Sequence, residues 1–133
     1  MTDPLVRFTK VRKSYGDFEA VKSLDLEIGR GEFVAIMGPS GCGKTTTLRM
    51  LAGLETPTSG QITIDGTVMN DVPAHARDTP MVWQSLALFP FLNVKENVEF
   101  GMTMRGVPAA DRHGRAMLWL ERMGLKGFEK RRI

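Results

Sequence analysis

The residues with the clearest potential for chemistry form one short run in the first half of the chain. It reads Gly38-Pro39-Ser40-Gly41-Cys42-Gly43-Lys44-Thr45, which satisfies the pattern G-x-x-x-x-G-K-[ST]. Glycines let the backbone curl so that successive N–H groups converge on an anion, and the positive end of a following helix strengthens that attraction. We expect Lys44 to place its charge between the β- and γ-phosphates and the Thr45 hydroxyl to bind Mg²⁺.

The pattern is too specific to be dismissed as a coincidence. Average amino-acid frequencies give a chance match in a chain of this length a probability on the order of 0.4%. The alternative interpretation is a glycine-rich turn between a strand and a helix that binds nothing. A buried-type strand before the loop and an amphipathic helix after it are the context that supports nucleotide binding. The run therefore predicts a nucleotide-binding loop.

The segments on either side of the loop predict the elements that position it. Residues 33–37 are continuously apolar, the pattern of a strand buried on both faces. Residues 44–53 place Leu48, Leu51 and Ala52 on one face of a helix. A strand that leads into a helix through the loop is the arrangement in which the helix N-terminus faces the bound phosphates.

Further elements follow from short-range patterns. Residues 5–11 mix apolar and polar positions like an exposed strand, residues 24–28 alternate like a half-buried strand, and residues 61–64 also alternate. Asp65-Gly66 predicts a hairpin turn into residues 67–69. Residues 81–83 are predicted to form a short buried strand that ends at Gln84.

The last third of the chain is predicted to be helical. Asn93 followed by Glu96 predicts a helix that starts with a capping box, and a final helix is expected between Pro108 and Gly124. Early hairpins, then strand, loop and helix, then further helices indicate a mixed α/β fold with a helical extension.

Composition limits the classes of protein that remain. The chain has 133 residues, of which 42% are hydrophobic and 25% charged, and a net charge of +3. These values fit one globular domain or part of one, and they exclude a disordered chain. No apolar run approaches the roughly 18 residues of a membrane span, and the N-terminus lacks the features of a secretory signal. One cysteine cannot form an internal disulfide, which fits a reducing cytosol, and the small net charge does not indicate a nucleic-acid partner.

Four segments carry a resemblance to a known family: Tyr15-Gly16, Gly38–Glu55, Thr58–Gly60 and Trp83–Gly101. They resemble the ATP-binding subunits of ABC transporters, most closely the importer branch that serves sugars, polyamines and ferric iron. The resemblance extends from about Leu5 to the C-terminus. It implies an α/β fold of the P-loop NTPase class, with an ABC ATPase-like core, an N-terminal antiparallel β subdomain and the start of a helical subdomain.

The resemblance also assigns roles to individual residues. Tyr15 matches the aromatic residue that stacks on adenine, and Gln84 matches the Q-loop glutamine that reaches Mg²⁺ or the attacking water. Lys44 and Gln84 are thereby catalytic residues, and Thr45 and Gln84 are metal ligands. Within the P-loop, or Walker A motif, Cys42 is expected to contribute its backbone N–H. The implied contacts to ATP are Tyr15, Gly38, Pro39, Ser40, Gly41, Cys42, Gly43, Lys44, Thr45 and Thr46.

Two positions depart from the usual pattern of the family. Trp83 stands where Phe is more common, and Phe91 stands where His is common. Both substitutions keep a bulky aromatic side chain, so nucleotide binding and the fold are expected to be unaffected. The two departures bear instead on which membrane partner the protein binds.

Several parts of a complete subunit do not occur in the 133 residues. They are an LSGGQ-type signature, an acid-bearing strand after residue 84 with a following Glu, and a switch His. We therefore interpret residues 1–133 as an incomplete ABC nucleotide-binding domain, truncated before the signature. The intact protein would be an ABC-type ATPase (a translocase). The 133 residues alone are expected to bind ATP weakly, without hydrolysis, and to be marginally stable.

The family implies partners that the chain itself does not contain. They are membrane permease subunits, contacted by the Gln84 loop and residues 89–94, and a second ATPase subunit, identical or paired. A solute-binding protein would take part indirectly. The implied location is the cytoplasm, peripheral on the inner face of the cell membrane. The sequence does not identify the solute.

Two other functions remain open from the sequence. The first is a non-catalytic nucleotide-binding or interaction module that ends at Ile133. ATP binding without turnover, together with a native stop codon after residue 133, would favour it. The second is another P-loop enzyme, such as a GTPase or a small-molecule kinase. The N-K-x-D motif that reads guanine is absent, and preference for GTP over ATP would be its signature.

Overall fold

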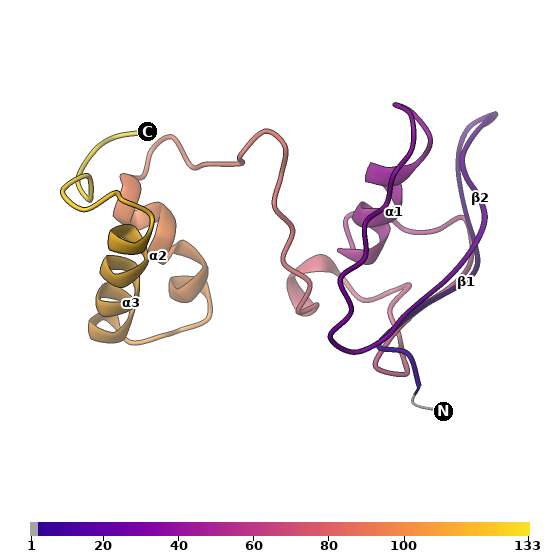
Figure 1. Cartoon of the computed structure of the whole chain (residues 1–133), viewed down its shortest axis with the longest axis horizontal. Coiled ribbons are helices and arrows are strands. Elements are labelled where there is room, and N and C mark those ends of the chain that lie inside the picture. The colour runs from indigo at the N-terminus through magenta and orange to yellow at the C-terminus, as the bar shows by residue number, and fades with distance from the viewer. Residues whose placement is uncertain (1–2) are drawn as a thin grey trace. The chain divides into compact units, whose positions relative to one another are not determined.

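The computed structural model describes residues 3–133, which fall into two compact units, one that ends at Met81 and one that begins at Val82. Figure 1 labels the principal elements along the chain. The first unit contains β1 (Val6–Tyr15), β2 (Phe18–Ile28), α1 (Lys44–Leu51), β3 (Ser59–Ile64), β4 (Thr67–Val68) and the 3-10 turn η1 (Ala74–Ala76). The second unit contains α2 (Val94–Met104) and α3 (Ala109–Arg122). Among the described residues, no helix has the length and apolar character that crossing a membrane requires.

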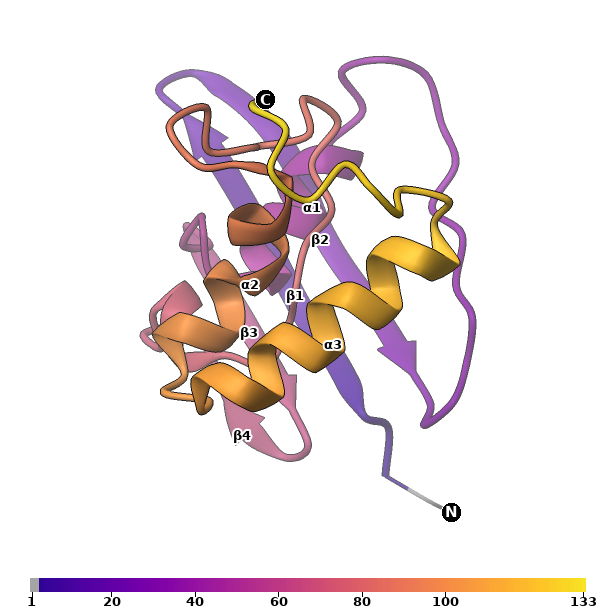
Figure 2. The ribbon, with the colours of Figure 1, turned by 90° about the vertical axis from the view of Figure 1, so that its left-hand side faces the viewer.

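The sheet of the first unit confirms the strands predicted from alternation. Its order is β2-β1-β3-β4, and each neighbouring pair is antiparallel (Figure 2). The strand β1 pairs Val6 with Ile28 on one side and with Ile64 on the other. The expected exposure of residues 5–11 is wrong, because β1 lies inside the sheet and its Val6, Phe8 and Val11 are buried. Asp65 and Gly66 both have positive φ, 48° and 75°, as a two-residue hairpin turn requires. The predicted hairpin between β3 and β4 is therefore confirmed.

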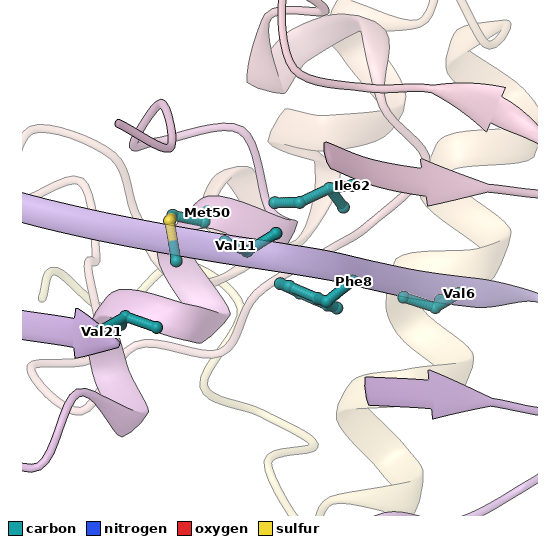
Figure 3. Packing of buried hydrophobic residues seen from close by; sticks show 6 residues of the cluster. All are labelled: Val6, Phe8, Val11, Val21, Met50 and Ile62. Atoms are coloured by element: carbon teal, nitrogen blue, oxygen red, sulfur yellow. The ribbon is translucent and has the colours of Figure 1, made fainter. Parts of the chain in front are cut away.

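One face of this sheet carries the hydrophobic core. Its buried side chains come mainly from the strands, and α1 adds Met50 (Figure 3). Phe8 and Val11 of β1 are 2% and 0% exposed, whereas the intervening Thr9 and Lys10 are exposed. The full cluster is Val6, Phe8, Val11, Val21, Met50 and Ile62.

Two strands predicted from apolar runs are not formed. Residues 33–37 and 81–83 are irregular, and Phe33 and Val82 are 96% and 95% exposed. A strand buried on both faces needs hydrogen-bonded neighbours and a layer of side chains above and below it. Within residues 3–133 the only sheet has four strands, and neither segment pairs with it. Both predictions are therefore wrong for this structure, although the loop and the helix that follow residue 37 are present.

The second unit contains the two helices α2 and α3, and the segment before α2 is held against it by hydrogen bonds. Asn93 and Glu96 form the predicted capping box at the start of α2, with side chain to backbone distances of 2.8 Å in both directions. The Asn97 amide bonds to backbone groups of Phe89, Leu92 and Asn93, so the segment before α2 is tied to the helix. The predicted last helix is confirmed as α3.

Candidate functional site

The predicted phosphate loop connects the irregular segment 33–37 to α1, and its backbone has the curled form that the glycines predicted. Gly41 and Gly43 have φ values of 80° and 88°. A Cβ on Gly43 would lie only 2.4 Å from the carbonyl oxygen of Ala20 in β2, because the loop packs closely against that strand. Glycine is therefore required at position 43 both for the left-handed conformation and for the contact with β2.

The start of α1 offers free donors to an anion. Gly43 is the N-cap residue, no side chain caps it, and the first turn carries no acidic residue. The first N–H groups of a helix have no partner within the helix, and they lie at the positive end of its dipole. These groups fit the negative charge of a phosphate.

Lys44 holds its ammonium group over the same loop. Its Nζ donates to the carbonyl oxygens of Gly38 and Pro39, at 2.6 Å each, and lies 3.4 Å from Cys42 Sγ. Cys42 is a free, exposed cysteine. An ammonium group has three donors, so Lys44 can exchange these carbonyls for phosphate oxygens without moving away from the loop.

Beside the loop lies a cavity of about 750 Å³. Three parts of the first unit line it: β2 and its start, the segment 34–37, and the loop with the first turn of α1. The wall from 34–37 is apolar, β2 adds both apolar residues and the charged Glu19 and Lys22, and the loop with the first turn of α1 supplies further polar groups. The cavity has the size and the distribution of polar groups of a small-ligand site.

Tyr15 is at the end of β1 and does not line this cavity. It is 45% exposed, and Lys13 Nζ lies 4.9 Å from the centroid of its ring. Its cross-strand partner Phe18 does line the cavity and is 60% exposed. Sequence reasoning passed over Phe18, although an aromatic residue three positions after Tyr15 is a usable signal. The stacking role of Tyr15 stays a prediction.

The remaining predicted ligands divide between the two units. Thr45 is exposed in the first turn of α1, and Thr46 is half-buried beside it. Gln84 is exposed in a turn of the second unit. The joint Mg²⁺ site of Thr45 and Gln84 therefore stays a prediction. The part of the chain that the structure describes has no group of three His, Cys, Asp or Glu side chains that could hold a metal ion.

A second residue that sequence reasoning missed is Arg77, which is buried behind α1. Its Nη1 donates to the carbonyl oxygens of Met50 and Leu51, at 2.9 Å each, and its Nε to that of Val72 at 2.8 Å. Nη2 also bonds to the Met69 carbonyl. Burial lowers the pKa of Arg77. No local pattern signals this role, because the acceptors lie up to 27 positions away.

Comparison with known proteins gives a consistent result. The ABC transporter family matches residues 21–133 of the chain. The chain is 49% identical to the spermidine/putrescine import ATP-binding protein PotA of Rubrobacter xylanophilus over 96% of the chain and 34% of that protein. It is 48% identical to the Fe(3+) ions import ATP-binding protein FbpC of Rhizobium etli over 95% of the chain and 36% of that protein. The chain thus spans about a third of the length of these relatives.

A solved structure has the same fold. It is the dimeric post-hydrolysis state of the ATP-binding cassette MJ0796 bound to ADP and Pi, with a TM-score of 0.81 and 32% identity. The alignment covers 96% of this chain and 61% of that one. The expected fold class, a partial P-loop ATPase of the ABC type, is confirmed. The chain belongs to the ABC transporter family.

Proposed function

We propose that this chain is the ATP-binding part of an ABC importer ATPase, in which ATP binding and hydrolysis drive the uptake of a solute. The observation that carries the proposal is the phosphate loop, with Gly43 in the left-handed region, an uncapped start of α1 and Lys44 over the loop. The relatives named above import polyamines and ferric ions. Because these relatives are named for different solutes, the proposal does not specify the solute of this chain.

Each predicted site residue has a distinct task in the proposal. The backbone N–H groups of Gly38 and of residues 40–43 donate to the phosphates of ATP, whereas Pro39 has no N–H and shapes the loop. Lys44 shields the charge of the β- and γ-phosphates. The Thr45 hydroxyl binds the Mg²⁺ that accompanies ATP. Gln84 completes the metal site and orients the attacking water, and Tyr15 stacks on adenine.

The partners belong to the intact protein. The loop that holds Gln84 exposes large apolar side chains, among them Leu86 at 73% and Phe91 at 78% exposure. Exposed apolar surface of this kind supports contact with another protein, here the membrane permease subunits, on the cytoplasmic face of the membrane. A second ATPase subunit would complete the ATP site. The solute-binding protein would act through the permeases.

Hydrolysis is proposed for the intact protein and not for residues 1–133. Phosphoryl transfer needs an acidic residue for Mg²⁺ and groups that position the nucleophile and stabilise the transition state. The 133 residues contain no LSGGQ-type signature and no acid-bearing strand after Gln84. We expect the chain to bind ATP weakly without turnover.

The decisive experiment is Lys44→Ala. The variant removes the ammonium but keeps the loop glycines, so we expect ATP binding to be lost while far-UV circular dichroism is unchanged. Binding is measured by titration with a fluorescent ATP analogue and by competition with ATP and GTP. Unchanged ATP affinity in the variant would overturn the phosphate-loop assignment. Preference of the parent chain for GTP would favour another class of P-loop enzyme.

A further inference from the structure

The tip of the β1–β2 hairpin is fastened to the segment that follows α1. The Ser14 N–H donates to Thr58 Oγ1 at 3.0 Å, and the Thr58 N–H donates to the Arg12 carbonyl at 2.8 Å. These two bonds lie on either side of Lys13 in the sequence. Lys13 and Tyr15 therefore have a defined position relative to residues 55–58.

The Lys13 ammonium group has three partners: a carboxylate, a backbone carbonyl and an aromatic ring. Its Nζ lies 3.1 Å from Glu55 Oε2, 2.8 Å from the Thr56 carbonyl oxygen and 4.9 Å from the centroid of the Tyr15 ring. The side chain is only 14% exposed, which is unusual for a lysine in a small unit. The hydrogen bond from Lys13 is also the main cause that lowers the pKa of Glu55, so the carboxylate is charged at neutral pH.

A backbone hydrogen bond of Glu55 connects this group of residues to α1, the helix that follows the phosphate loop. The Glu55 N–H donates to the carbonyl oxygen of Arg49, in the last turn of α1, at 3.3 Å. The first turn of α1 carries Lys44. One short helix therefore has the phosphate-binding residues at its start and, just beyond its end, the carboxylate that holds Lys13.

We propose that Lys13, held by Glu55 and the Thr56 carbonyl, is a positioning residue that fixes the Tyr15 ring for stacking on the adenine base. The inference rests on the proposed function, because it gives Lys13 a role only if Tyr15 contacts the base. A cation over an aromatic face restrains the ring, and a ring that is already oriented loses less conformational freedom when a ligand binds. Tyr15 keeps 45% of its surface exposed for that contact.

The test compares ATP with inorganic triphosphate, which lacks the base. In the parent chain, ATP should bind more tightly than triphosphate. Lys13→Met keeps most of the apolar stem and removes the cation, so ATP affinity should fall about twofold to fivefold, with triphosphate affinity unchanged. Lys13→Arg keeps the cation and should retain the parent ratio. Lys126→Met removes another lysine paired with a glutamate, Glu121 at 2.7 Å, in the second unit, and should change neither affinity.

A double-variant cycle separates positioning from general support of the fold. Since Lys13 acts through the ring, Lys13→Met should have no further effect on ATP affinity once Tyr15→Ala has been made. Equal losses for ATP and triphosphate in Lys13→Met, or additive effects with Tyr15→Ala, would overturn the inference alone. If Lys13→Met does not fold by circular dichroism, Lys13→Gln replaces it, with the loss still confined to ATP; Glu55 is not varied, because its carboxylate also bonds to the Tyr15 side chain. Failure of the parent chain to bind ATP would overturn the proposed function and this inference with it.

Discussion

At the scale of single residues, Gly41 and Gly43 show that the phosphate loop depends on local backbone form and on one close contact. Both residues have a left-handed φ, but their surroundings differ. A Cβ on Gly41 would meet no atom within 4 Å, whereas a Cβ on Gly43 would meet the Ala20 carbonyl oxygen at 2.4 Å. Residue type and spacing predicted the shared conformation. They could not predict the contact, because Ala20 is on a strand more than twenty positions earlier.

Replacing each of these two glycines by alanine gives a matched pair of variants, because both have a left-handed φ and only Gly43 has the close contact with β2. Gly41→Ala should lower the free energy of unfolding by about 1 kcal/mol, the cost of a left-handed backbone for alanine. Gly43→Ala adds the clash with β2, so it should cost about 2 kcal/mol or more and also weaken ATP binding by displacing Lys44. Urea unfolding followed by circular dichroism, with an ATP titration, measures both effects. Equal stability losses would contradict the importance of the β2 contact.

At the scale of elements, α1 depends on Arg77 as much as on its own sequence. The guanidinium donates to the carbonyls of Met50 and Leu51, so it places a cation at the negative end of the helix. It supplies the Leu51 carbonyl with a donor, and the Met50 carbonyl also accepts from the Gly53 N–H. The N-terminal end is left open by Gly43. A helix with a closed C-terminus and an open N-terminus is suited to hold an anion at one end only.

Arg77→Met tests this arrangement. The variant removes the Arg77 donor from the Leu51 and Val72 carbonyl oxygens, whereas those of Met50 and Met69 keep backbone donors, so the free energy of unfolding should fall by about 3 kcal/mol. Arg30→Met is the control, because Arg30 pairs with Asp65 where both side chains are more than 60% exposed, and its loss should be below about 1 kcal/mol. Chemical denaturation of the two variants gives the comparison. A loss for Arg77→Met no greater than that of the control would show that the carbonyls are satisfied in another way.

Elements were predictable where the signal was local. The alternation in β2, the turn at Asp65-Gly66 and the capping box of Asn93 each depend on neighbours in sequence, and all three are present. The apolar runs 33–37 and 81–83 carry a different signal. They indicate that a segment suits a buried environment, but the layers that would bury it are distant in sequence. The strand prediction failed for both runs for that reason.

At the scale of the whole molecule, both units expose apolar residues of the kind that cores usually contain. Phe33 in the first unit is 96% exposed and Val82 in the second is 95% exposed. The chain spans about a third of its relatives' length, and those relatives have further segments that could cover the corresponding residues. Covered surface of this type would stabilise a complete domain by roughly 25 cal/mol per Å². The expected marginal stability of residues 1–133 follows from the same surface and stays a prediction.

The exposed surface can be measured with the dye ANS, which binds accessible apolar side chains. We expect the 133-residue chain to bind ANS while folded. The double variant Phe33→Ser with Val82→Ser should bind less, with circular dichroism unchanged and a change in unfolding free energy within about 0.5 kcal/mol, as for other surface positions.

Phe8→Ser provides the opposite control. Phe8 is 2% exposed in the core of the first unit, and a polar group placed there without partners should cost several kcal/mol. This variant should therefore bind more ANS and lose circular dichroism signal. The two results together would distinguish apolar residues that stabilise the core from apolar residues that are exposed in the folded chain. If the Phe33→Ser with Val82→Ser variant also unfolded, both side chains would have to contribute to the stability of the folded chain, which would contradict the prediction.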